Sequence, residues 1–376
     1  MSLDREFWRG RRVFLTGHTG FKGSWLSLWL SRLGAELAGY ALDPPTNPSL
    51  YEQAGVASCL HAVYGDIRDY DRLRSTIAEF QPQVIFHLAA QSVVRTGYEY
   101  PVENYATNVM GTVHLLEAVR TLKRKCVVVN VTSDKCYENR EWVWGYREDE
   151  PMGGHDPYSN SKGCAELVTS AFRDSYFPSD SFHEHGIAVA SARAGNAIGG
   201  GDWTAYQLIP DLMRAFMSGR PCLIRNPLSH RPWQFVLEPL RGYLLLAEHL
   251  GAKGAQFASG WNFGPRDDDA RPVAWIADNL AFKWGRGASW VQDSADFAKE
   301  AHALKLDASK AAAYLDWRPV LPLGEALTWI VKWYREFENG SDLREVTLQQ
   351  IERYESLFPD FELDASKTGN LFRESR

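Results

Sequence analysis

Short apolar runs alternate with amphipathic stretches through the first half of the chain. Runs rich in β-branched residues are expected to be buried strands, at positions 13–16, 36–41, 61–64, 84–88, 126–131 and 187–192. Helical patterns separate them, at 22–33, after the expected N-cap Asp69, at 104–119 and at 158–172. Alternating strands and helices indicate βαβ units in a parallel sheet, and the near-continuous apolar strands fit burial on both faces.

The pattern changes near residue 195. Beyond it the chain is rich in Trp, Pro and Arg, and mixed helices with short strands are expected. We predict an α/β fold, with a Rossmann-type doubly wound parallel sheet in a domain over 1–195 and a smaller C-terminal mixed α/β substrate domain over 196–376. Some segments of the second domain are expected to return to the sheet. Residues 138–155 are expected to be a long loop or lid, and the last residues a tail.

Composition narrows the class of protein. Hydrophobic residues make up 45% of the chain and charged residues 23%, so a large core can form. The net charge of -6 argues against nucleic acid as the main partner. The five cysteines form no C-x-x-C pair, which favours reduced thiols and a cytoplasmic location. The sequence shows neither a signal peptide nor an apolar run of the length that a membrane helix needs, so no membrane partner is expected.

A glycine-rich turn follows the first predicted strand, with Gly17, Gly20 and Gly23 spaced three and three. Such glycines permit a tight turn, a close approach of a pyrophosphate to the backbone, and close packing of helix on strand. The free N–H groups of the helix would hold the anion. The same spacing also suits a plain strand-to-helix turn without a ligand. We assign to this cofactor site Gly17, Thr19, Gly20, Phe21, Lys22 and Gly23.

Asp43, at the end of the second strand, is the expected determinant of cofactor choice. A carboxylate there would bind the adenosine ribose hydroxyls and repel a 2′-phosphate, so NAD is favoured over NADP. The alternative is that Asp43 only opens the turn at Pro44 and Pro45. Further cofactor contacts are expected after the third and fourth strands, at Asp66, Ile67, Leu88, Ala89 and Ala90.

Tyr158 and Lys162 lie four apart at a predicted helix start, which puts them on one helical face. An ammonium beside a phenol and the positive charge of a bound nicotinamide are both expected to lower the phenol's pKa, so Tyr158 could take a proton from a hydroxyl while hydride leaves the same carbon. A solvated surface pair is the alternative. Both residues are also expected to contact the cofactor.

Ser133, Asp134 and Lys135 follow the fifth strand, at the sheet edge where open α/β sheets bind ligands. Ser133 can hydrogen-bond a substrate hydroxyl. Asp134 and Lys135 add an acid and a base, which suggests a second proton transfer such as elimination of water requires. A strand-terminal ion pair is the alternative reading of Asp134 and Lys135.

These motifs resemble those of the extended short-chain dehydrogenases/reductases and, within them, the sugar-nucleotide 4,6-dehydratases. The resemblance covers roughly residues 8 to 340 and includes the segments 87–92 and 104–111. Longer stretches resemble the branch of these dehydratases that acts on CDP-glucose, at 17–25, 42–46, 194–203 and 231–239. The resemblance also assigns Asn108 and Thr132 to the cofactor, and Gln91, Ser92, Asn196 and Arg231 to the substrate, Arg231 as a pyrophosphate clamp.

The resemblance implies an NAD-dependent lyase that converts CDP-D-glucose to CDP-4-dehydro-6-deoxy-D-glucose for deoxysugar and surface polysaccharide synthesis, including lipopolysaccharide O-antigen. Tyr158 would deprotonate the 4-hydroxyl, and Asp134 would protonate the departing 6-hydroxyl. Dehydratases of the dTDP-glucose type carry Glu as the C5 base where this chain has Lys135. Lys135 could be a base only if neutral, and otherwise could position the ketone or the 6-hydroxyl.

Other functions remain open at this level. A sugar-nucleotide 4-epimerase would need no Asp134–Lys135 pair, and a non-catalytic NAD-binding regulator would not need Tyr158, Lys162 and Ser133 together. The dehydratase type that acts on UDP-N-acetylglucosamine also carries an Asp-Lys pair but lacks the match at 231–239. The helix 104–119 resembles the family's dimer helix, so a homodimer or homotetramer is expected. No metal is expected, because His183-Glu184-His185 lies in a polar loop without a third ligand.

Overall fold

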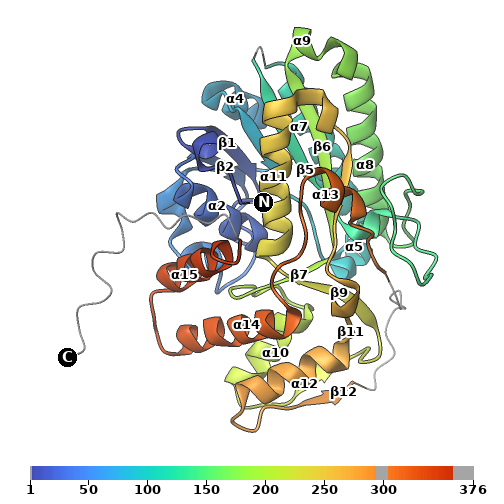
Figure 1. Cartoon of the computed structure of the whole chain (residues 1–376). Helices are drawn as coiled ribbons and strands as arrows, with labels where there is room; N and C mark the ends of the chain where they lie inside the picture. Colours follow the sequence, from blue (N-terminus) through green and yellow to red (C-terminus); the bar gives the residue numbers. More distant parts are fainter. Residues whose placement is uncertain (1, 123, 294–303, 359–376) are drawn as a thin grey trace.

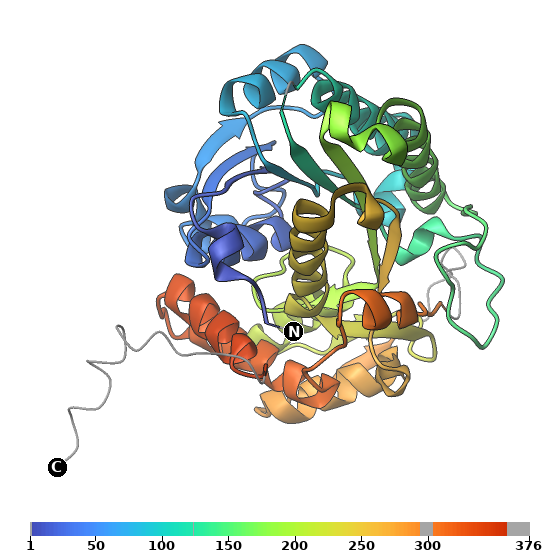
Figure 2. The same ribbon diagram turned by 45° about the horizontal axis from the view of Figure 1, so that its top comes forward.

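A sheet of seven parallel strands forms the centre of the molecule in the computed structural model, which describes residues 2–122, 124–293 and 304–358 (Figures 1 and 2). The strands run in the order β10-β6-β5-β4-β1-β2-β3. Their bounds are β1 (Arg12–Thr16), β2 (Glu36–Ala41), β3 (His61–Tyr64), β4 (Val84–His87), β5 (Cys126–Val131), β6 (Ile187–Ala194) and β10 (Gly260–Phe263). The predicted doubly wound sheet is confirmed, and its strand order reverses between β1 and β4, where such sheets bind ligands.

Alternate residues of each strand feed hydrophobic cores on opposite faces of the sheet. Val13 and Val127 belong to one core, and their neighbours Phe14 and Val128 belong to the other. One face is covered by α2 (Phe21–Arg32) and α11 (Leu237–Lys253), with α15 (Leu343–Glu355) packed on α2, and the other by α4 (Tyr70–Phe80), α7 (Gly111–Arg120) and α8 (Pro157–Tyr176) (Figure 1). Burial on both faces explains the near-continuous apolar character of the strands.

The second half of the chain builds smaller sheets and helices beyond the end of β6 (Figure 1). Their elements are β7 (Asn196–Ile198), β8 (Cys222–Ile224), β9 (His230–Phe235), β11 (Ala270–Pro272), β12 (Trp290–Gln292), α10 (Leu208–Met217), α12 (Val273–Trp284) and α14 (Leu323–Glu338). β10 then returns to pair with β6 in the large sheet. The domain boundary after 195 stays a prediction. The predicted tail at the end of the chain lies outside the described residues.

Short helices complete the chain: α1 (Arg5–Trp8), α3 (Leu50–Gln53), α5 (Val94–Glu99), α6 (Pro101–Tyr105), α9 (Phe182–His185) and α13 (Ser309–Tyr314). The predicted helix 104–119 is instead α6, a π-helical turn (Ala106–Met110) and α7 in succession. β6 also runs two residues further than predicted, because Arg193 and Ala194 pair with β10, and the buried Arg193 is paired with Glu166 at 2.9 Å. Within the described part of the chain, none of the helices combines the length and the apolarity that crossing a bilayer requires.

The N-terminal helix α1 is fastened to α11 by one buried carboxyl group. Glu248 accepts hydrogen bonds from Trp8 Nε1 at 2.6 Å and from the Asp4 backbone N–H at 3.0 Å. Burial raises the pKa of Glu248 to about 8, so the folded protein keeps this carboxyl protonated at neutral pH.

We therefore expect the wild-type protein to lose stability as pH rises from about 4.5 towards 8, by up to about 1.4 kcal/mol per pH unit. Between these values the unfolded carboxyl releases a proton that the folded one retains, which favours unfolding. Glu248→Gln keeps the acceptor oxygen and should flatten this part of the profile, as measured by urea unfolding from pH 5 to 9. Equal slopes in both proteins would contradict the assignment.

Candidate active site

The turn between β1 and α2 requires glycine at both of its ends. Gly17 has a φ of +76°, and a Cβ there would lie 2.8 Å from the Ala89 backbone nitrogen. A Cβ on Gly23 would lie 2.1 Å from the Gly17 carbonyl oxygen. Gly20 occupies the N-cap of α2 without a side-chain cap, which leaves helix N–H groups for an anion. The cradle therefore fits a dinucleotide pyrophosphate.

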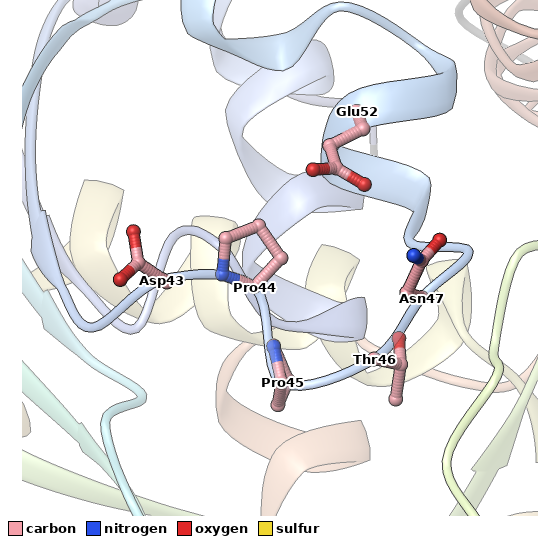
Figure 3. A pocket seen from close by; sticks show the side chains of 6 residues that line it. All are labelled: Asp43, Pro44, Pro45, Thr46, Asn47 and Glu52. Atoms are coloured by element: carbon pink, nitrogen blue, oxygen red, sulfur yellow. The ribbon is translucent and has the colours of Figure 1, made fainter.

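The turn after β2 lies beside this cradle and is fastened to it. Thr19 Oγ1 donates a hydrogen bond to the Leu42 carbonyl oxygen at 2.9 Å. The next residue, Asp43, lines a hollow of about 470 Å³ between β2 and α3 (Figure 3). The other lining residues are Pro44, Pro45, Thr46, Asn47 and Glu52. An exposed carboxylate at the rim of this hollow suits the hydroxyls of an adenosine ribose.

The residues after β3 and β4 that are predicted to contact the cofactor lie in different environments. Leu88 and Ala89 donate backbone hydrogen bonds to the Thr16 carbonyl and hydroxyl oxygens, and Ala90 follows them directly. Ile67 is buried, and a Cβ on Gly111 would lie 2.9 Å from it. The Asp66 carboxylate is bonded to Arg68 at 2.6 Å, and this hydrogen bond lowers the pKa of Asp66.

Asn108 lies in the π-helical turn, and its side chain links neighbouring segments by hydrogen bonds. Its amide nitrogen donates to Gln91 O, Asn104 Oδ1 and Ser161 Oγ, and its Oδ1 accepts from the Gln91 N–H at 2.8 Å. These bonds join the loop after β4 to α8. The structure thus gives Asn108 a supporting part in the site, and its direct contact with a cofactor stays a prediction.

Tyr158 and Lys162 lie one turn apart on α8, with 7% and 6% of their surface exposed. Burial raises the pKa of Tyr158, although a side-chain hydrogen bond with Ser133 opposes the rise. Burial and the charge of Lys22 lower the pKa of Lys162 to about 8. The prediction that Lys162 and a bound nicotinamide together lower the pKa of Tyr158 stays a prediction, because in the protein alone burial has the largest effect on this phenol.

Asp134 follows β5 in a short 3-10 turn and is 2% exposed. Its Oδ1 accepts a hydrogen bond from Ser133 Oγ at 2.9 Å, and its Oδ2 has no partner among the described residues. Burial raises the pKa of Asp134 against the opposing charges of Lys135, Lys22 and Arg231. A carboxyl group held towards its neutral form can act as a proton donor.

The predicted substrate residues approach this carboxyl group from the second half of the chain. Asn196 of β7 pairs in register with Trp233 of β9, and Arg231 lies two residues earlier on β9. A Cβ on Gly195 would lie 3.1 Å from Asp134 Oδ2. On the other side, Gln91 keeps a buried Oε1 without a described partner and Ser92 is exposed.

Sequence reasoning missed two charged residues beneath the site, Glu166 and Arg193. The signal for Glu166 was its position four residues after Lys162 on the same helix face. The signal for Arg193 was a charge at the end of an otherwise apolar strand. No cluster of three or more His, Cys, Asp or Glu side chains suited to a metal occurs in the part of the chain that the structure describes.

Comparison with known proteins places these motifs in context. The family model for GDP-mannose 4,6 dehydratase matches residues 14–328. The CDP-glucose 4,6-dehydratase of Salmonella typhimurium (strain LT2) is 56% identical over 94% of this chain and 99% of its own. The NAD-bound dTDP-glucose 4,6-dehydratase of Bacillus anthracis has the same fold, with a TM-score of 0.72 and 21% identity over 89% of this chain and all of its own. The epimerase Mth375 of Methanothermobacter thermautotrophicus superposes with a TM-score of 0.75, at 22% identity over 91% of this chain and 96% of its own.

Gly20 and Gly23 form a matched pair for testing the cradle. A Cβ on Gly20 meets only the Gly17 carbonyl oxygen at an ordinary 3.5 Å, so Gly20→Ala should fold normally and weaken NAD binding by reducing the approach of the pyrophosphate. Gly23→Ala should lower the melting temperature as well. Calorimetric titration with NAD and thermal unfolding check both variants. Wild-type NAD affinity in Gly20→Ala would refute the cradle as the pyrophosphate site.

Proposed function

The chain belongs to the GDP-mannose 4,6-dehydratase family of extended short-chain dehydrogenases/reductases, and we propose on that premise that it dehydrates CDP-D-glucose to CDP-4-dehydro-6-deoxy-D-glucose. The observation that carries the proposal is the buried Asp134 carboxyl beside Ser133, at the same edge of the sheet as Tyr158 and Lys162. An enzyme that only oxidises or epimerises needs no second buried acid. The CDP-glucose preference rests on the 56% identical relative.

NAD is the proposed cofactor. The cradle of Gly17, Gly20 and Gly23 would hold its pyrophosphate, and Asp43 its adenosine ribose. Thr19, Phe21 and Lys22 complete that turn, and Leu88, Ala89, Ala90 and Thr132 lie towards the nicotinamide end. When bound, NAD would accept hydride from the sugar C4 and later return it to C6.

The chain's own residues move the protons. Tyr158 takes the proton of the 4-hydroxyl, with Ser133 hydrogen-bonded to the substrate and the Lys162 ammonium stabilising the phenolate. The resulting ketone acidifies the C5 proton. Asp134, whose pKa burial raises, gives its proton to the departing 6-hydroxyl, which leaves as water. Two alternative roles are proposed for Lys135. It is either the base at C5 or a group that orients the ketone.

Substrate recognition is proposed to involve both halves of the chain. Arg231 clamps the pyrophosphate of the sugar nucleotide with a planar pair of donors. Asn196 lies on the nucleotide side, and Gln91 and Ser92 lie at the sugar. The product would supply deoxysugars for surface polysaccharide such as lipopolysaccharide O-antigen. All five thiols are unpaired, which supports a reducing cytoplasmic location.

Incubation with CDP-glucose and with its UDP, dTDP and GDP counterparts tests this proposal by mass spectrometry. We expect a loss of about 18 mass units, one water, with CDP-glucose alone or fastest. Lys135→Met should leave C4 oxidation intact and block dehydration, whereas full turnover would remove Lys135 from the essential groups. An unchanged mass with altered stereochemistry at C4 would instead indicate a 4-epimerase.

We also propose that the chain forms a homodimer or homotetramer through the outer surface of α7 and α8. Met110, just before α7, and Leu167 of α8 are 46% and 60% exposed, although α7 and α8 pack side by side. We take these two exposed side chains, on neighbouring elements, as parts of one association surface.

Leu167→Glu should convert the assembly to monomers, because a charge would be buried at the contact. Analytical ultracentrifugation measures the change. Leu228→Glu is the control, since Leu228 is 82% exposed between β8 and β9, outside α7 and α8. An unchanged sedimentation coefficient in Leu167→Glu would exclude this surface.

A further inference from the structure

A buried polar cluster centred on Glu166 lies beneath the proposed catalytic residues. Glu166 is 5% exposed and stands on α8, one turn beyond Lys162. Its Oε1 accepts a hydrogen bond from Thr132 Oγ1 at 2.5 Å, and its Oε2 accepts from Ser191 Oγ at 2.6 Å and from Arg193 Nη2 at 2.9 Å. Burial alone would raise the pKa of Glu166, but the Arg193 charge and these donors lower it, so the carboxylate stays ionised.

Arg193 extends the cluster towards the loop after β5. Its Nη1 donates to Tyr137 Oη at 2.6 Å and to the Glu148 carbonyl oxygen at 2.9 Å. Tyr137 in turn donates to Asn262 Oδ1 on β10 at 2.7 Å. A buried ion pair of this kind contributes little net stability, because desolvation offsets the attraction. Its presence here therefore calls for an explanation other than stability.

The protonation state of Lys162 provides an explanation for the buried Glu166–Arg193 pair. The surroundings of Lys162 lower its pKa and so favour loss of its proton. Burial and the ammonium of Lys22 on α2 both act against the charged form. His87 of β4 also lies close, but burial keeps it neutral by lowering its pKa to about 3. Cys136 after β5 and Glu166 act in the opposite direction, and of these two Glu166 is the ionised group.

We propose that Glu166 is a positioning residue that lies beneath Tyr158 and Lys162 and supports them. Its carboxylate fixes Thr132 next to Ser133 and holds Lys162 as an ammonium, and Arg193 keeps Glu166 itself ionised. The Arg193 guanidinium also connects Glu166 to the loop after β5, at Tyr137 and Glu148. The catalytic meaning of the Lys162 charge rests on the proposed function, whereas the link between Glu166 and Lys162 does not.

Glu166→Gln tests the link directly through the lysine ¹³Cε resonances of labelled protein, with the Lys162 signal identified by its loss in Lys162→Met. We expect the Lys162 titration midpoint to fall by about one pH unit, the lower end of the effect of a nearby opposite charge. Glu355→Gln is the matched control. Glu355 is also 5% exposed and accepts from Trp29 Nε1 at 2.8 Å and Arg32 Nε at 3.2 Å, among α2 and α15. It should lower the melting temperature without moving the Lys162 midpoint.

Glu166→Gln leaves the Arg193 charge buried, which could prevent folding. The double variant Glu166→Gln/Arg193→Gln removes both charges and should recover the melting temperature while the Lys162 midpoint stays low. A wild-type midpoint in the folded variants would overturn the proposal and leave Glu166 with a structural role only.

Turnover gives a second readout. Dehydration requires charged Lys162, so the rate falls as pH rises through the Lys162 pKa. In Glu166→Gln the alkaline limb of the kcat profile should move to lower pH by the same amount as the NMR midpoint, with KM unchanged. Absence of dehydration in the wild type would refute the proposed function, and the NMR titration would still decide the part played by Glu166.

Discussion

Burial of a parallel sheet on both faces directs ligand-binding groups to the carboxyl ends of its strands. The strands of this sheet feed apolar side chains into two cores, and helices cover each of them. The polar side chains of the candidate site lie at the carboxyl ends of the strands, where Asp43, Ser133 and Asp134 follow β2 and β5. Burial at this edge also shifts the pKa values of Asp134 and Lys162.

Loss of hydration acts on each titratable group according to its charge. It favours the neutral form of Asp134, which suits a proton donor, and it favours neutral Lys162, which does not suit a group that must stabilise a phenolate. The lowering of the Lys162 pKa by burial is opposed by the ionised carboxylate of Glu166, one turn further along α8. Glu166 can remain charged because Arg193 and two hydroxyl groups solvate it in place of water.

The sequence predicted the central sheet well because strand and helix periodicities are local. The strands β1 to β5 begin and end within about a residue of their predicted positions. Tertiary interactions explain the failures. β6 continues through Arg193 and Ala194 because both pair with β10, a strand from the second half of the chain. The helix over 104–119 contains a π turn at Asn108, whose amide hydrogen-bonds to other segments. Glycine spacing predicted the tight turn between β1 and α2, but the burial that shifts the pKa values of Tyr158 and Lys162 depends on packing that a linear pattern does not contain.

The hydrogen bond from Thr19 to the Leu42 carbonyl has a consequence for redesign of the cofactor preference. It joins the glycine-rich turn to the turn that presents Asp43, so the two ends of the proposed dinucleotide site are not independent of each other. Replacing Asp43 with a smaller or basic residue would create room and charge for a 2′-phosphate. Such an exchange also places new demands on the backbone at Leu42, and through Thr19 on the cradle. A change of specificity towards the phosphorylated dinucleotide therefore needs both turns to be redesigned together.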